Sequence, residues 1–334
     1  MLAALIESPG EVNVRDVPRP QARGAALVRV TQAGICGTDV KIASGAIPVA
    51  LPRVLGHEMT GQVESPGPRE LVPVGTPVLV NPATFCGYCD LCRRDLPHLC
   101  RNGGLIGRDC DGTFAEYIAV DEAFLHPLPA GMPDDGAALL QVLSTCVHAQ
   151  SGLRVSPTDT AVVVGLGVSG MLHIQLLRDR GVKTIIGITR SRWKQVLAEK
   201  LGAMAATSPE DAEQVVADAT GGRGADVAIE CAGTEETLAQ AMRLAGAGGT
   251  ILVFGTTVPA ADAMPTYDWY FKELTILNTR AARPRDCDVA IRLCAEGRLD
   301  LDQLITGTFP LQDASRALDA CRDPSQLKIV LSIS

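Results

Sequence analysis

DTAVVVGLGVSG, residues 159–170, is the stretch of the chain that decides its fold. An apolar run, Ala161–Val164, leads directly into glycines at positions 165, 167 and 170. The pattern predicts a buried strand, then a G-x-G-x-x-G turn that opens a helix. In such a turn the glycines let the backbone approach a pyrophosphate, and the helix N-terminus offers free N–H groups to it. We therefore interpret Gly165, Gly167 and Gly170 as a dinucleotide-binding turn, with a plain strand–helix turn as the alternative.

Apolar strands and amphipathic helices alternate after this turn. The expected helices cover residues 168–181, closed by Gly181, and 191–203, closed by Gly202; the expected strands cover 182–190, 224–233, 248–257 and 274–280. This alternation predicts an α/β domain with a doubly wound parallel sheet of the Rossmann type. Beyond about residue 284, the pattern predicts one helix over 287–299 and a final strand over 326–334.

The region before the turn has a different composition. Residues 1–150 are rich in proline and glycine, with short β-type runs at 25–35, 76–82 and 113–120. Runs of this kind between turn residues predict a mostly β region. The pattern changes near SGLRVSPTD, residues 151–159, which we interpret as a boundary between two domains.

Charge and hydropathy exclude several classes of protein. The chain has 334 residues and a formal net charge of -8, which argues against a nucleic-acid partner or an anionic membrane surface. No apolar run reaches membrane-spanning length, and the start of the sequence lacks the basic segment of a signal peptide. We expect a cytoplasmic protein with a small-molecule partner, bound to neither nucleic acid nor membrane.

Four cysteines follow one another closely in CGYCDLCRRDLPHLC, residues 86–100. Their C-x2-C-x2-C-x7-C spacing, at Cys86, Cys89, Cys92 and Cys100, is typical of tetrahedral zinc ligation by thiolates. An iron–sulfur cluster is the rival interpretation, although a ferredoxin-type run ends in C-x3-C-P. Because a site with four thiolate ligands is closed, we expect a structural metal here and the chemistry elsewhere.

The end of the second expected strand distinguishes NADP from NAD. An NAD enzyme usually carries Asp or Glu there, whereas this chain has Thr189 and Arg190, followed by Arg192 and Lys194. A hydroxyl and a guanidinium bind a 2′-phosphate that a carboxylate would repel. We therefore predict NADP(H) in preference to NAD(H). The alternative is a solvated basic helix start, which is disfavoured because cations are unfavourable at a helix N-terminus.

Two further motifs carry metal-binding residue types. Cys36 precedes Thr38 and Asp39 in AGICGTDVKI, and His57 precedes Glu58 in VLGHEMTG. Each alone would usually be a core thiol or a core histidine. Together with the four-cysteine loop and GLGVSG, in this order along nearly the whole chain, they resemble the motifs of the zinc-containing medium-chain alcohol and polyol dehydrogenase family.

The resemblance implies a fold and an activity. It implies a GroES-like catalytic domain over residues 1–149 with a zinc lobe at about 81–104, a Rossmann nucleotide-binding domain over 150–283, and a return to the catalytic domain over 284–334. It further implies an enzyme with one catalytic and one structural zinc that transfers a hydride between NADP(H) and an alcohol or carbonyl substrate. By the same resemblance we expect a homodimer or homotetramer.

The resemblance also assigns roles to residues. Cys36 and His57 would be ligands of the catalytic zinc, and Glu58 would lie beside the ion and bind it directly when required. Thr38 would pass the substrate proton, and Asp39 would orient His57 from behind.

The third zinc ligand departs from the family pattern. The family has Cys, Glu or Asp there, whereas LLQVLSTCVHA places Gln141 at this position, with Cys146 five residues later as a rival ligand. With Cys36 as the only constant anionic ligand, the ion would stay more positive and act as a stronger Lewis acid. By the resemblance, a neutral glutamine at this place implies polyols, sugars or secondary alcohols as substrates.

Three weaker assignments follow from the same alignment. Lys41 replaces a histidine that relays the proton in many relatives, and it is either a relay or a solvated side chain. Thr145 aligns with a threonine near the nicotinamide, and Lys328 with a basic residue that reaches the pyrophosphate. The alternatives for these two are a core threonine and an exposed strand lysine.

Two rival functions remain open at the level of sequence. A zinc-independent quinone or enoyl reductase of the same superfamily is one, but such proteins usually lack the cysteine loop and the Cys–His pair. A cofactor-binding or sensing protein without turnover is the other, and only the unusual Gln141 favours it.

Overall fold

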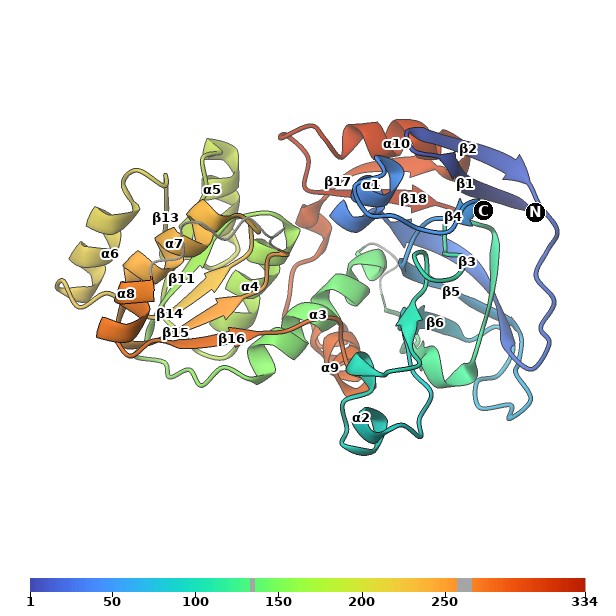
Figure 1. Ribbon diagram of the computed structural model, residues 1–334, viewed down its shortest axis with the longest axis horizontal. Helices are drawn as coiled ribbons and strands as arrows, with labels where there is room; N and C mark the ends of the chain where they lie inside the picture. The colour runs from blue at the N-terminus through green and yellow to red at the C-terminus, as the bar shows by residue number, and fades with distance from the viewer. Residues whose placement is uncertain (133–135, 257–265, 334) are drawn as a thin grey trace. The chain divides into compact units, whose positions relative to one another are not determined.

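The computed structural model describes residues 1–132, 136–256 and 266–333, and it divides the chain into two compact units. The first unit comprises Met1–Ser144, Ala281–Gly297 and Leu301–Ser334. The second comprises Thr145–Arg280 and Arg298–Asp300. Each is described by itself below, with the elements labelled as in Figure 1.

The second unit is built on a six-stranded parallel sheet, in the order β13-β12-β11-β14-β15-β16. Its strands are β11 (Thr160–Val164), β12 (Thr184–Ile188), β13 (Ala205–Thr207), β14 (Ala225–Glu230), β15 (Ala245–Val253) and β16 (Thr275–Asn278). This order, 3-2-1-4-5-6 along the chain, is that of a Rossmann fold. The predicted α/β fold class is confirmed. The last residue of the expected strand 248–257, Thr257, lies outside the described residues.

Helices join these strands: α4 (Val168–Asp179), α5 (Arg192–Lys200), α6 (Ala212–Thr220), α7 (Glu235–Leu244) and α8 (Thr266–Phe271). The buried strand residues Val162, Ile186 and Ile251 pack in one apolar cluster with Val216 of α6 and Met242 of α7. Burial of such side chains, worth about 1.5–3 kcal/mol each, holds the helices on the sheet. Because all six strands are parallel, their carboxyl ends lie at one edge of the sheet, where Gly165 and Glu230 are found.

The first unit is mostly β. Its main sheet has the order β10-β6-β5-β3-β18-β17, with β9 also paired to β3, and two small sheets, β2-β1-β4 and β7-β8, accompany it. The strands are β1 (Leu2–Ser8), β2 (Glu11–Asp16), β3 (Ala26–Gly34), β4 (Arg53–Val54), β5 (Glu58–Ser65), β6 (Pro77–Val80), β7 (Ala83–Thr84), β8 (Gly104–Leu105), β9 (Tyr117–Val120), β10 (Leu125–Pro127), β17 (Ile305–Pro310) and β18 (Lys328–Ser332). The last strand, β18, lies antiparallel to β3, so residues 26–34 and 328–332 are neighbours in one sheet.

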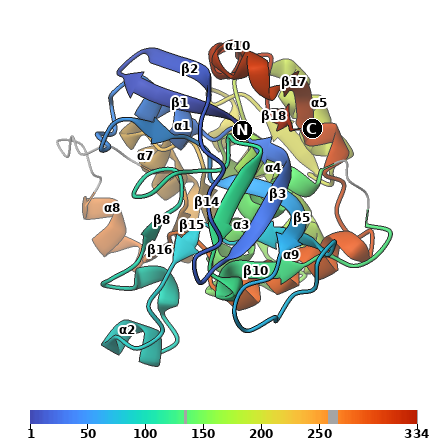
Figure 2. The same cartoon turned by 90° about the vertical axis from the view of Figure 1, so that its right-hand side faces the viewer.

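Short helices connect these strands: α1 (Gly37–Ala43), α2 (Asp90–Arg93), α9 (Pro284–Ala295), α10 (Ala314–Ala320) and the 3-10 turns Pro97–Leu99 and Ala137–Leu139. In both views α2 and α10 lie at opposite ends of this unit (Figures 1 and 2). A buried cluster that includes Val28, Leu55, Phe114 and Leu331 forms its core. The core therefore joins the first strands of the chain to the last.

The structure adds elements that the sequence patterns did not predict. Helix α3 (Leu140–Ser151) occupies the end of the region expected to be β, and it crosses the boundary between the two units at Ser144 and Thr145. Strands β13 and β17 and helix α10 are also additions. Each is short or interrupted, as β17 is by Gly307, so its apolar periodicity is weak.

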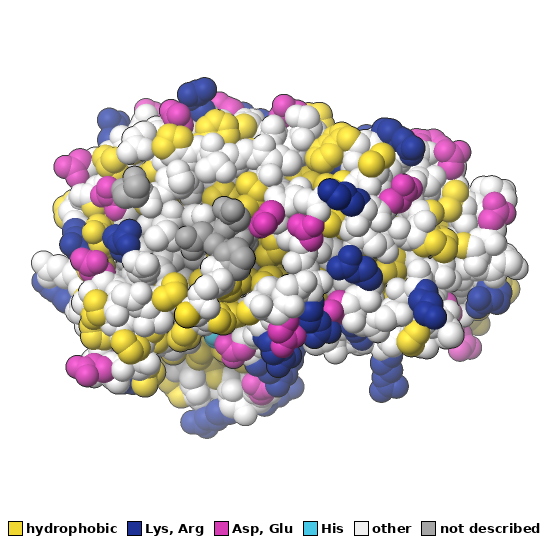
Figure 3. Space-filling view, turned by 180° about the vertical axis from the view of Figure 1, so that it is seen from behind, with side chains coloured by type: hydrophobic (Ala, Val, Ile, Leu, Met, Phe, Trp, Pro, Cys, Tyr) yellow, Lys and Arg dark blue, Asp and Glu magenta, His cyan; other side chains and the backbone are white. Residues whose placement is uncertain are grey.

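Charged side chains of both signs are interspersed over the face shown in Figure 3. Exposed ion pairs of the first unit include Arg101 with Asp90 and Arg19 with Glu64. Within the described residues, no helix is long and apolar enough to cross a bilayer.

Candidate active site and metal sites

Three metal-binding side chains converge at one end of the strand pair β3–β5. The two strands are antiparallel, with Gly34 opposite Glu58, so the residues that follow β3 meet those that open β5. Cys36 caps α1 just after β3, and His57 directly precedes β5. The ligand atoms of Cys36, His57 and Glu58 all lie within 4.8 Å of one another. A thiolate, an imidazole and a carboxylate are donors that zinc takes in proteins, so the set fits this ion.

Asp39 fixes the orientation of this cluster from behind. It is fully buried, and its Oδ1 lies 3.2 Å from His57 Nδ1. Its Oδ2 accepts the Cys36 backbone N–H at 2.8 Å, and Oδ1 also accepts that of Gly56 at 3.2 Å. An Nδ1–H bonded to a carboxylate leaves Nε2 of His57 with its lone pair available. One carboxylate therefore positions both the cysteine and the histidine.

The electrostatics of the cluster favour a cation. Burial alone would lower the pKa of His57, but the charges of Asp39 and Cys36 oppose burial and raise this pKa well above its ordinary value. A metal ion requires the neutral imidazole and takes the place of the proton. The same negative surroundings that hold a proton on His57 would thus hold a divalent ion.

Asp39→Asn is expected to weaken zinc binding at this cluster by about 10- to 100-fold, the usual effect of losing a carboxylate behind a ligating histidine. The amide can accept from only one side, so one of the Cys36 and Gly56 N–H groups also loses its acceptor. Competition with a chromophoric chelator measures the zinc Kd. The matched control is Asp288→Asn, which alters a carboxylate 2.7 Å from His126 Nδ1 in the same unit. Equal zinc affinities in wild type and Asp39→Asn would contradict the positioning role.

Lys328 is paired with a residue of this cluster. Its ammonium forms an ion pair with the Glu58 carboxylate and donates to the Ile35 carbonyl at 3.0 Å. It is 3% exposed, so the alternative of an exposed strand lysine is wrong. Burial opposes its charge, but Glu58 and Cys36 together raise the pKa of Lys328. Glu58 therefore has a cationic partner even without a metal.

The other residues predicted for the catalytic site lie on the helices α1 and α3. Thr38 and Lys41 are both half-buried on α1, three residues apart, and so occupy neighbouring positions on one face. Gln141 is buried in the first turn of α3 and belongs to the same unit as Cys36. Thr145 and Cys146 also lie on α3 but belong to the second unit, where Cys146 Sγ is 4.0 Å from the Ser169 carbonyl. Residues five apart on a helix point about 140° apart, so Gln141 and Cys146 face different neighbours.

The four-cysteine loop forms a second cluster. Sulfur–sulfur distances are 3.5 Å for Cys86–Cys100, 3.5 Å for Cys89–Cys92 and 3.8 Å for Cys89–Cys100. These distances exclude disulfides, whose sulfurs are about 2.0 Å apart. They match the separation of about 3.8 Å between sulfurs of a tetrahedral site with Zn–S bonds of about 2.3 Å. The loop therefore fits a closed four-thiolate site.

Charges in this loop are incompatible with four free thiolates. Burial opposes ionisation of Cys86, but N–H groups of Tyr88 and Cys89 lower the pKa of its thiol to about 6. Burial and then the neighbouring thiols raise the pKa of Cys92 to about 12. A bound cation would favour the thiolate of Cys92 and so oppose the burial and the hydrogen bonds that keep it protonated. Outside the sulfurs, an ion pair from Arg101 to Asp90, with contacts of 2.7 and 3.0 Å, fastens the loop.

The glycine turn of the second unit has the geometry that a dinucleotide requires. Gly165 follows β11 at φ +92°, a left-handed conformation that favours glycine. A Cβ on Gly170 would collide with the Gly165 carbonyl, so α4 approaches the turn closely. A Cβ on Gly167 would meet no atom within 4 Å, so space is open at the N-terminus of α4. Free N–H groups face this space, where a pyrophosphate would fit.

Thr189 and Arg190 stand beside this turn. The Gly165 N–H donates to the Ile188 carbonyl at 3.0 Å, so the end of β12 touches the glycine turn. Gln195 of α5 donates to the Thr189 carbonyl at 3.0 Å and fixes the strand end. Arg190 is exposed.

Glu230 is a residue of this site that the sequence patterns did not single out. It ends β14, is fully buried, and accepts from the N–H groups of Ala232 and Gly233 at 2.7 Å each and from the Thr237 hydroxyl at 2.9 Å. A Cβ on Gly165 would meet the Ala232 nitrogen at 2.8 Å. Glu230 therefore shapes the wall opposite the glycine turn, and its signal was an acid at the end of the apolar run ADVAIE.

Comparison with known proteins shows the family of this chain. The family model for the alcohol dehydrogenase GroES-like domain matches residues 22–130, and that for zinc-binding dehydrogenases matches residues 168–296. The chain is 31% identical to the D-arabitol-phosphate dehydrogenase of Enterococcus avium, over 91% of this chain and 89% of the relative. It is 32% identical to the 2-dehydro-3-deoxy-L-galactonate 5-dehydrogenase of Pseudoalteromonas atlantica, over 89% of this chain and 88% of the relative.

Solved structures show the same similarity. A protein of Sinorhizobium meliloti described as a zinc-binding dehydrogenase, solved bound to NADP, superposes with a TM-score of 0.91 at 32% identity, over 99% of this chain and 98% of that one. An alcohol dehydrogenase of Thermus sp. ATN1 superposes with a TM-score of 0.93 at 30% identity, over 100% of both chains.

Proposed function

This chain belongs to the zinc-binding dehydrogenase family of NAD(P)-dependent alcohol oxidoreductases, and we propose that it uses zinc to transfer a hydride between NADP(H) and a polyol, sugar or secondary alcohol. The observation that carries the proposal is the convergence of the Cys36, His57 and Glu58 ligand atoms within 4.8 Å. The names of two relatives, which act on a pentitol phosphate and a sugar acid, support the choice of substrate class.

The cluster residues would hold the ion and the substrate oxygen in place. A zinc ion supplies Lewis-acid polarisation of that oxygen, and NADP⁺ supplies the hydride acceptor. Cys36 and His57 are the constant ligands in the proposal, with Gln141 as the neutral third donor. Asp39 keeps Nδ1 of His57 protonated and so directs Nε2 to the cluster.

Proton release is assigned to α1. The Thr38 hydroxyl, two residues after Cys36, is the proposed acceptor of the substrate proton, since a hydroxyl accepts one proton while it donates another. Lys41 lies one helical turn further on and is the proposed next group in the path. Such positioned proton transfers contribute about 10²–10⁴-fold to rate.

Glu58 would alternate between two partners. In the structure its carboxylate is paired with Lys328. Binding of Glu58 to the ion would release that ammonium, which Ile35 still holds through its carbonyl. We therefore propose that Lys328 serves as the counter-ion of Glu58, and its contact with the pyrophosphate stays a prediction. Thr145 keeps its proposed place near the nicotinamide.

The second unit would bind the cofactor through its glycine turn. The N-terminus of α4 is the proposed pyrophosphate site, supported by the open space at Gly167. Thr189 and Arg190 are the proposed 2′-phosphate ligands. These residues support NADP(H), as does the NADP-bound relative.

A spectrophotometric assay tests the reaction class. Absorbance at 340 nm would be followed with NADP⁺ and a panel of polyols, aldoses and secondary alcohols, using the full chain. Reduction of NADP⁺ with at least one group of these substrates is the expected result. A zinc-independent quinone or enoyl reductase would show instead the oxidation of NADPH by quinones or enones.

Arg190→Ala is expected to raise the KM for NADP⁺ by about 10- to 100-fold while the KM for NAD⁺ stays unchanged. The reason is the loss of one charge-assisted hydrogen bond to phosphate, worth about 1.5–3 kcal/mol. The control is Arg223→Ala, an exposed arginine of the same unit that precedes β14 and so lies at the opposite edge of the sheet. Faster turnover of NAD⁺ than of NADP⁺ by the unaltered chain would contradict the proposed preference.

We also propose a homodimer or homotetramer formed through sheet edges. Strand β16 ends the parallel sheet and pairs only with β15 among the described strands. An open edge strand presents unpaired backbone groups that a second copy can satisfy.

A further inference from the structure

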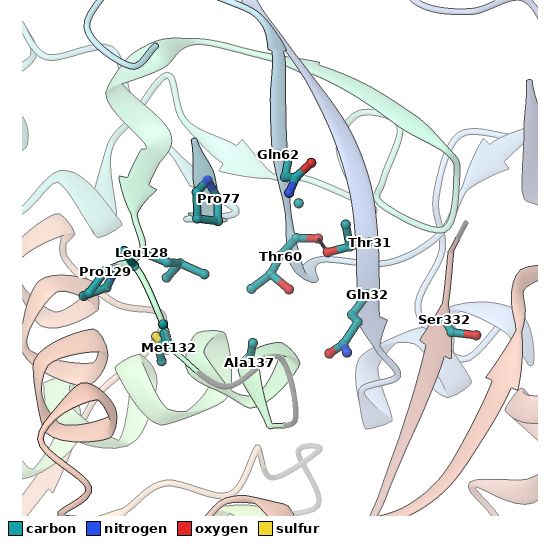
Figure 4. Close-up of a pocket in the computed structure, with 13 residues that line it drawn as sticks. Thr31, Gln32, Thr60, Gln62, Pro77, Leu128, Pro129, Met132, Ala137 and Ser332 are labelled. Carbon is teal, nitrogen blue, oxygen red and sulfur yellow. Dashed lines mark hydrogen bonds between the residues drawn. The ribbon is translucent and has the colours of Figure 1, made fainter. Parts of the chain in front are cut away.

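A cavity of about 430 Å³ lies on one face of the main sheet in the first unit (Figure 4). Its floor is a row of side chains on three adjacent strands, Ser332 of β18, Gln32 of β3 and Thr60 of β5, which face one another in register. The segment from Leu128 to Met132 covers it from the side. This volume falls within the range of about 300–1,000 Å³ that is typical of small-molecule sites.

A β-bulge aims two consecutive side chains into this cavity. In the pairing of β3 with β5, Val30 lies opposite Gly61 and Gln32 opposite Thr60, so Thr31 is an extra residue. Without the bulge, Thr31 and Gln32 would point to opposite faces. With it, both line the cavity, and the Thr31 hydroxyl donates to the Thr60 carbonyl at 3.1 Å. Bulges of this kind recur beside binding sites, where they re-aim a side chain.

The cavity has one polar side and one apolar side. One side offers hydroxyls and amides from Thr31, Gln32, Thr60 and Gln62, and the other offers apolar groups from Pro77, Leu128 and Met132. None of the described residues that line the cavity carries a charge. The Gln32 Oε1 atom is buried and has no hydrogen-bond partner within the described structure. A carbonyl oxygen without a donor is unfavourable, and a ligand hydroxyl would supply the donor.

We propose that this cavity binds a neutral polyhydroxylated molecule, such as a polyol or a free sugar. Each ligand hydroxyl donates one hydrogen bond and accepts others, as the amide and hydroxyl groups of the floor require. The C–H face of the carbon chain packs against Leu128 and Met132. The absence of a described basic residue in the lining disfavours phosphorylated ligands. No residue of the Cys36–His57–Glu58 cluster lines the cavity, so this is a second site.

The experiment must separate this cavity from the catalytic cluster, since Thr60 follows Glu58 by two residues on the same strand. Equilibrium dialysis with radiolabelled sorbitol, without cofactor, is done on the full chain carrying Cys36→Ala. About one bound sorbitol per chain is expected in this background. Adding Gln32→Leu should weaken binding by about tenfold or more, and Thr60→Val, which keeps the side-chain shape, by about 3- to 10-fold. Sorbitol 6-phosphate should bind at least tenfold more weakly than sorbitol.

The matched control is Gln326→Leu. Gln326 also has a buried Oε1 without a described partner and lies in the same unit, but it does not line the cavity. It should leave sorbitol binding unchanged. No binding in the Cys36→Ala background would overturn the proposal, as would binding that Gln32→Leu and Thr60→Val both leave intact. Because the readout is binding and not turnover, the two proposals can fail separately. An unaltered chain that shows no activity in the 340 nm assay but binds sorbitol would contradict the proposed function alone.

Discussion

Cys36→Ala is expected to lower kcat/KM by about 10³-fold or more and to reduce the zinc content from two ions per chain to one. The cysteine contributes the thiolate of the catalytic cluster, and its backbone is held by Asp39 at 2.8 Å. Without it, the proposed donors are His57, the neutral Gln141 and the Glu58 carboxylate. That carboxylate already has Lys328 as a partner. Atomic absorption on the dialysed protein measures the zinc, and the 340 nm assay measures the rate.

The control for this variant is Cys321→Ala. Cys321 is a half-buried thiol of the same unit that donates to the Ala317 carbonyl at 3.3 Å and is not part of either cysteine cluster. Both zinc ions and most of the activity should survive this change. A Cys36→Ala enzyme that keeps two zinc ions and full activity would show that the cluster is not the catalytic metal site.

Cys92→Ala is expected to remove the other zinc ion and to destabilise the loop over residues 86–100. Loss of a structural metal belongs to the small class of changes that cost about 4 kcal/mol or more. For a domain of this size, such a loss lowers Tm by roughly 8–16 °C. The physical reason is that α2 has no buried residue of its own, so the metal would be the nucleus of this loop. Differential scanning calorimetry and limited proteolysis measure the effect.

Cys110→Ala is the matched control for the loop. Cys110 is exposed and lies ten positions after Cys100, outside the cluster. It should change neither the zinc content nor Tm. If Cys92→Ala kept both zinc ions and the wild-type Tm, the loop would be a set of independent thiols.

The fold of the second unit could be predicted from the sequence because its strand, turn and helix patterns each lie within a short stretch of residues. In β11 and α4, a continuous apolar strand, a glycine turn and an amphipathic helix follow one another without interruption. Strand β13 was missed because its three residues, Ala205–Thr207, are only half-buried and show no period. Helix α3 was missed because short apolar stretches do not separate strand from helix by pattern alone.

The signals of the candidate metal ligands were also local, because Cys36 and His57 each lie in a short sequence motif. Their contacts, in contrast, come from residues that are distant in the sequence. Lys328 reaches the Ile35 carbonyl across 293 positions of sequence, and only the pairing of β18 with β3 brings them together. The sequence pattern gives Glu230 no role beyond the end of a strand. Its role follows from the N–H groups of Ala232 and Gly233, which donate to its carboxylate. The cavity at Gln32 depends on a bulge, which no residue pattern predicted.

Titration of zinc into metal-depleted enzyme tests the proposed catalysis most directly. The full chain would be dialysed against a chelator until only the tightly held structural zinc remains, and NADP⁺ reduction would be followed as zinc is returned. We expect activity to be near zero at one zinc ion per chain, to rise linearly, and to saturate at two. Full activity at one zinc ion per chain, with no gain from a second, would contradict a catalytic metal at Cys36, His57 and Glu58.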